Sequence, residues 1–159
     1  MAKKQQDKTF DNYKDNIEEQ KNEINKKINS LEQKLISLQN KESIINSLIL
    51  KINTELENTD PKHFKAISQI RTTLNKQFET LSLIMDMIIK VEDMIQKYRK
   101  MLIDIENKQI DNFIKLNKEI QMEENDLASL LTVLNQNISS NQQNPIIEEA
   151  LIELKNEGY

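Results

Sequence analysis

The sequence predicts an all-α protein, built as a long antiparallel helical hairpin or as a three-helix coiled-coil-like bundle, with a short C-terminal helix. Apolar residues recur at intervals of seven along most of the 159 residues, a spacing that keeps one side of a helix against a partner helix. The chain also has one Gly and two Pro. So few turn-forming residues argue against a hairpin-rich β architecture.

The first predicted helix runs from about residue 7 to residue 58. An apolar residue stands at every seventh position: Phe10, Ile17, Ile24, Leu31, Leu38, Ile45 and Ile52. The other core position of the heptad holds three charged residues: Lys14, Lys21 and Glu42. Lys14 and Lys21 predict weak packing before Ile17, and tight packing is expected from Ile24 onward except at Glu42. Either the three charged residues specify register or their long side chains reach outward over the contact.

A chain reversal is expected at residues 58–61. Asp60 is a suitable helix N-cap, and Pro61 would then occupy the first helical position, where its missing N–H costs nothing. Because the connection is short, the two helices should fold back on each other as a hairpin.

The second predicted helix has more apolar surface than a hairpin can cover. Ten of the fifteen residues from Leu81 to Ile95 are apolar, so more than one face needs a partner. That partner is either a third helix or a neighbouring subunit. The residues predicted for an oligomer or partner interface are Leu81, Ile84, Met85, Ile88, Val91 and Ile95, with Ile147, Leu151 and Leu154 near the C-terminus.

The third segment continues the repeat. Its apolar positions are Phe113, Ile120, Leu127 and Leu134. The interval from Leu102 to Phe113 is a heptad plus four, which indicates either local unwinding of one continuous helix or a break within 106–112. We favour the break, which gives three antiparallel helices within a domain spanning 1–138.

A polar linker at 139–144 separates this domain from a short amphipathic helix predicted over 145–159. Asn144 and Pro145 repeat the cap-then-proline signal. So short a helix is marginal alone and must dock on the body or on a partner protein. Its terminal position favours a partner.

Charge is distributed unevenly around the net value of −4. Residues 61–101 carry eight basic and four acidic side chains, and residues 102–159 carry four basic and eleven acidic ones. Helices of opposite charge would attract each other within a bundle. Alternatively Lys97, Arg99 and Lys100, together with Tyr98, form a small phosphate-contacting patch for nucleic acid.

The residues that enzymes need are scarce. With His63 as the single His and no Cys, no nucleophilic triad and no thiolate metal site can be assembled. The only Gly is Gly158, so a Gly-rich phosphate loop is excluded. Glu119, Glu123, Glu124 and Asp126 resemble a solvated helix face more than a cation site. We therefore expect no enzyme activity, cofactor, metal or small-molecule substrate.

One stretch resembles a known family. Asp60-Pro61-Lys62-His63-Phe64, followed by a helix from Ile67 to Met87, is similar to the helical hairpin of the small terminase subunit of contractile-tailed phages, over about residues 56–87. The resemblance implies two long antiparallel helices and a ring of subunits that assists DNA packaging.

The sequence thus favours a non-enzymatic, self-associating structural or adaptor protein. The alternatives are a viral DNA-packaging adaptor and a regulatory protein that binds a partner through its C-terminal helix. No signal peptide and no run of about 18 apolar residues is found, so we expect a cytoplasmic or virion-associated protein without membrane contact.

Overall fold

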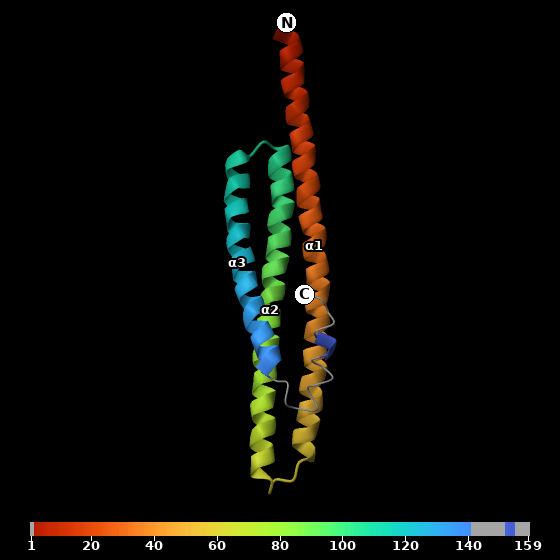
Figure 1. The fold of residues 1–159 in the computed structure, drawn as a ribbon, viewed down its shortest axis with the longest axis vertical. Helices are drawn as coiled ribbons and strands as arrows, with labels where there is room; N and C mark the ends of the chain where they lie inside the picture. The colour runs from red at the N-terminus through yellow and green to blue at the C-terminus, as the bar shows by residue number, and fades with distance from the viewer. Residues whose placement is uncertain (1, 141–151, 155–159) are drawn as a thin grey trace.

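The computed structural model describes the backbone of residues 2–140 and 152–154, and the side chains of 16–139 and 152–154. Three long helices follow one another: α1 over Ala2–Asn58, α2 over Phe64–Glu106 and α3 over Ile110–Ser140. They pack as an all-α bundle with residues 152–154 as a further helical piece, which confirms the predicted fold class (Figure 1). Of the two arrangements left open, the three-helix bundle is the one observed.

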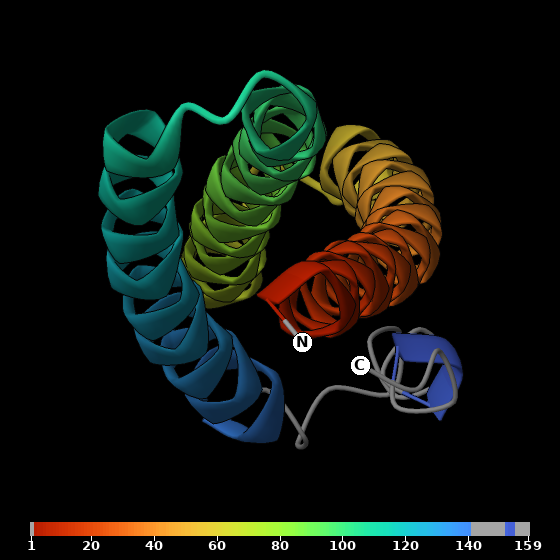
Figure 2. The same cartoon turned by 90° about the horizontal axis from the view of Figure 1, so that it is seen from above.

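Helix α2 is the centre of the bundle. It packs along α1 on one side and along α3 on the other, whereas α1 and α3 have little direct contact (Figures 1 and 2). Helix α1 is the longest of the three and runs past the α2–α3 turn as a single helix at its N-terminal end (Figure 1). The bundle therefore has one fully shared helix and two outer ones.

The first reversal differs from its predicted geometry. Helix α2 begins at Phe64 with His63 as its N-cap, not with Asp60 as the cap and Pro61 as the first residue. The Asp60 carboxylate instead accepts a hydrogen bond from the Lys62 N–H at 3.0 Å, and its carbonyl accepts one from the His63 N–H at 3.0 Å. Asp and Pro both stabilise such local turns, so the pair closes a turn before the helix starts.

The second reversal, within residues 107–109, has a left-handed residue. Lys108 has φ 59°, and Asn107 is the C-cap of α2. The N–H of Gln109 donates to the carbonyl of Asp104 at 2.8 Å, and that of Lys108 to Ile105 at 3.3 Å. This hydrogen-bond pair is the Schellman motif, which usually has Gly at the left-handed position. A lysine there costs conformational energy.

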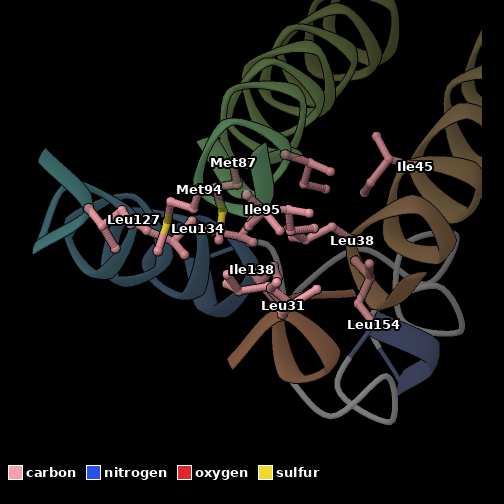
Figure 3. Close-up of a cluster of buried hydrophobic side chains, with 14 of the residues drawn as sticks. Leu31, Leu38, Ile45, Met87, Met94, Ile95, Leu127, Leu134, Ile138 and Leu154 are labelled. Atoms are coloured by element: carbon pink, nitrogen blue, oxygen red, sulfur yellow. The ribbon is translucent and has the colours of Figure 1, made fainter. Parts of the chain in front are cut away.

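The core consists of the heptad residues of α1 together with residues from both other helices. Leu38 and Ile45 of α1 are fully buried, as are Met87 of α2 and Leu134 of α3 (Figure 3). Buried core residues of α1 begin at Ile24 among the described side chains. Lys21, at the weak end of the heptad series, reaches outward to Glu106 at 3.2 Å.

The structure revises the predicted interface. Ile84, Val91 and Ile95 are buried within one chain, because α1 and α3 together cover the two apolar faces of α2. Leu154 is likewise 3% exposed and belongs to the core cluster, near Leu38 in Figure 3. These four residues are core residues of the chain and not surface available to a partner.

Candidate functional site

Lys97 of α2 is the centre of the charged contact between α2 and α3. Its ammonium group lies 3.0 Å from the Asp93 carboxylate, 3.6 Å from that of Glu119, and within an ion pair with Glu123. The side chain is mostly covered by α3, and Lys90 forms a second link between the helices, 3.4 Å from Asp126. Lys90 and Lys97 of α2 therefore attract the acidic α3 through named pairs, as the charge distribution predicted.

Burial and pairing shift the acidity of this cluster. Burial by itself would lower the pKa of Lys97, but hydrogen bonds with Glu123 and Asp93 outweigh it and raise that pKa. Burial is also the main reason that the pKa of Glu123 lies above its ordinary value. Hydrogen bonds with Glu123 and then Lys97 hold the pKa of Asp93 below its ordinary value. Lys97 is thus kept charged, and the cluster orients the two helices.

Tyr98 connects all three helices at the level of this cluster. Its ring is buried in the core, its hydroxyl donates to the Glu124 carboxylate of α3 at 3.3 Å, and the Lys27 ammonium of α1 lies 5.8 Å from the ring centroid. Burial, followed by the nearby charge of Glu124, raises the pKa of the Tyr98 hydroxyl to about 12. The side chain is therefore a structural link, since a protonated phenol here is a hydrogen-bond donor.

The predicted phosphate patch is not assembled. Lys97 faces α3, whereas Arg99 reaches α1 and lies 3.4 Å from Glu32. Two positions on a helix that are two residues apart point about 200° away from each other. Lys100 is exposed and lies three residues after Lys97, on a neighbouring strip of α2. Lys97 and Arg99 therefore point away from each other, and each is paired with a carboxylate of the same chain.

The remaining predicted interface residues lie in different environments. Leu81 and Ile88 are half-buried against the core, and Met85 is 46% exposed. Ile147 and Leu151 lie outside the described residues. Of the predicted set, Met85 is the one with substantial exposed surface among the residues described.

An apolar groove runs along the outer side of α2 and α3. It measures about 500 Å³ and is lined by Asp86, Ile89, Lys90, Asp126, Ser129, Leu130 and Val133. Ile89 is 62% exposed, and Val133 on the opposite wall is also exposed. Phe78, Met85 and Ile89 share one face of α2, because they are separated by seven and four residues. We call the hollow lined by these seven residues from Asp86 to Val133 the outer groove; Phe78 and Met85 are not among them.

A second hollow lies at the end of the bundle. This end cleft of about 370 Å³ is lined by Asn16, Ile17, Gln20, Asp104, Ile105, Lys108, Gln109, Ile110, Phe113 and Ile114. It lies where α1 passes the α2–α3 turn (Figure 1). Ile110 and Ile114 leave its rim apolar and exposed.

The other polar candidates have structural explanations. His63 is an exposed N-cap residue without a side-chain capping bond. Glu119 and Glu123 pair with Lys97, Asp126 with Lys90, and Glu124 with Tyr98. Over the described residues no three His, Cys, Asp or Glu side chains are grouped as ligands for a metal ion. Nor does any helix in that part of the chain have the length and apolarity that crossing a membrane requires.

Comparison with known proteins gives no relative. No family model, no curated protein and no solved structure matches the chain. The function therefore has to be argued from the surfaces just described.

Sequence reasoning overlooked the outer groove. Met85 and Ile89 lie within the apolar run from Leu81 to Ile95, which was predicted only to need partners on more than one face. Only the position of α3 shows which part of that surface stays uncovered, and Leu130 and Val133 complete it from the other wall.

Proposed function

We propose that the chain is a non-enzymatic, self-associating structural or adaptor protein that assembles through the outer groove of α2 and α3. The supporting observation is the set of large apolar side chains left exposed in the groove, and elsewhere on α2 and α3, after the core is complete. They are Phe78, Met85 and Ile89 of α2 and Met122 and Val133 of α3. Exposed apolar patches rimmed by polar residues mark interaction sites in proteins.

The bundle itself needs no further helix to complete its core. Leu38, Ile84 and Leu134 are fully buried within one chain. Assembly would therefore join preformed bundles, so each chain should fold before it associates. A variant that no longer associates should therefore keep the helix content of the wild type.

The test compares one lysine substitution in the groove with one outside it. Ile89→Lys places a charge in the outer groove, whereas Ile36→Lys changes a similarly exposed residue, 51% exposed, on α1. We expect the wild type and Ile36→Lys to sediment as oligomers at micromolar concentration and Ile89→Lys as a monomer. Circular dichroism should show the same helix content for all three.

Two results would contradict the proposal. If the wild-type chain is a well-folded monomer throughout the micromolar range, it does not self-associate and the proposal is wrong. If the Ile89→Lys variant still forms the oligomer, the outer groove is not the surface through which the chain assembles.

A second candidate is the oligomeric DNA-packaging adaptor implied by the resemblance to small terminase subunits. The observation that favours it is the antiparallel α1–α2 hairpin joined at the turn of Asp60 to His63. Since Lys97 and Arg99 are held in ion pairs within the chain, this role would rest on assembly. Electron microscopy of the purified chain should then show closed rings. Assemblies without rings would count against it.

A further inference from the structure

We propose that the occupant of the outer groove is a second copy of this chain, with the two α2 helices antiparallel about a two-fold axis level with Ile88. This inference rests on the proposed function, because it names the partner and the orientation at the same surface. Two features of the groove support it, one in its apolar surface and one in its charges.

The apolar surface of the groove is complementary in shape to a second copy of itself. A two-fold contact uses the same patch on both subunits, so the patch must combine a protrusion with a hollow. Met85 and Ile89 form an exposed ridge on α2, and Leu130 and Val133 form the far wall of the hollow beside it. The ridge of each copy would then enter the hollow of the other, as ridges and grooves interlock between packed helices.

Two charged side chains of opposite sign line the groove. Asp86 and Lys90 both line it, two residues before and two residues after the level of Ile88. In an antiparallel pair centred at that level, position 86 of one copy faces position 90 of the other. Both Asp86–Lys90 contacts therefore form at the same time.

The structure leaves Asp86 available for this role. Among the described residues Asp86 has no ion pair, whereas Lys90 already lies 3.4 Å from Asp126 across the groove. Association would place Lys90 between Asp126 of its own chain and Asp86 of the second copy. Two carboxylates on one ammonium resemble the arrangement around Lys97, where Asp93 and Glu123 share one cation.

The charges also select the orientation. A parallel pair in register would face Asp86 with Asp86 and Lys90 with Lys90, and juxtaposed like charges oppose association. A helix of an unrelated partner would need no symmetry in these charges. Opposite charges four residues apart can form both contacts with a second copy only in the antiparallel orientation, and this self-complementarity favours a second copy as the occupant.

The test is a charge swap in two separate full-length variants. Asp86→Lys gives a surface with two cations, and Lys90→Asp gives one with two anions, so each variant alone should associate at least about tenfold more weakly than the wild type. An equimolar mixture should regain association, because a mixed pair forms both opposite-charge contacts. Native mass spectrometry resolves the two variants and counts mixed pairs. Glu57→Lys, at an exposed acid of α1 far from the groove, should leave association unchanged.

Each outcome is decisive. Recovery in the mixture supports the two-fold pair. Weakening without recovery, or no weakening at all, in a chain that still assembles overturns the pair but leaves self-association standing. A wild-type chain that does not associate overturns the proposed function together with this inference. Circular dichroism of both variants checks that loss of association is not loss of folding.

Discussion

The two helix contacts made by α2 differ in chemistry. Against α1 its buried partners are aliphatic heptad residues such as Leu38, Ile45 and Ile52. Against α3 it combines apolar contacts with ion pairs of Lys90 and Lys97. The α1–α2 contact is mainly a hydrophobic strip, and its ion pairs, Lys21–Glu106 and Arg99–Glu32, each include an exposed carboxylate. The α2–α3 contact has the more covered ion pair of Lys97 with Glu123, and it lies beside an open groove.

The two contacts should therefore contribute differently, one to the free energy of folding and the other to the alignment of the helices. Apolar burial is non-directional and supplies most of the free energy of folding. Ion pairs that are partly exposed add little net stability, but they penalise wrong alignments of two helices. We infer that the α1–α2 contact holds the bundle together and that the α2–α3 contact sets how the third helix lies, and with it the shape of the outer groove.

The largest expected effect is at the α1–α2 contact. Leu38 is 0% exposed, so Leu38→Ala should lower the free energy of unfolding by about 2–5 kcal/mol through lost burial and a residual cavity. Urea denaturation measures this. Leu50→Ala, at a residue that is 68% exposed on the same helix, should change stability by less than about 0.5 kcal/mol. Equal losses in both variants would show that this face of α1 is not the stabilising one.

A smaller effect is expected at the charged contact. Lys97→Met keeps most of the aliphatic stem but leaves Asp93, Glu119 and Glu123 without their shared cation. The free energy of unfolding should fall by about 1–2 kcal/mol, less than for a fully buried pair because the group is partly exposed. Lys100→Met, at an exposed position, is the matched control. A loss as large as that of Leu38→Ala would erase the proposed division between the two contacts.

The smallest effect concerns the turn that joins α2 to α3, and it should be a gain. Lys108 has φ 59°, a conformation that glycine adopts without the Cβ clash. Lys108→Gly should raise the free energy of unfolding by about 1 kcal/mol, and Lys108→Ala should not. Thermal melting followed by circular dichroism measures both. A destabilised glycine variant would show that the left-handed turn is not a source of strain.

The α1 heptads were predictable because a seven-residue apolar repeat depends only on the period of a helix, and Leu31, Leu38 and Ile45 are buried as that repeat requires. The start of α2 was mispredicted, since Asp60 and Pro61 favour a turn as strongly as a helix start. The left-handed conformation of Lys108 was not predictable, because glycine, the usual residue in that conformation, is absent from this turn. The outer groove depends on the path of α3, which no local pattern contains.

The most direct test of the central claim, that α2 of one copy meets α2 of another across the outer groove, is disulfide trapping in single-cysteine variants. The chain has no cysteine, so each introduced one is the sole thiol. Mild oxidation of Ile89→Cys should yield a covalent dimer, because the two positions lie next to the axis. Phe78→Cys, on the same face, should yield little, because antiparallel packing separates its two copies by about 30 Å along the helices. A covalent dimer at position 78 with none at position 89 would contradict the account.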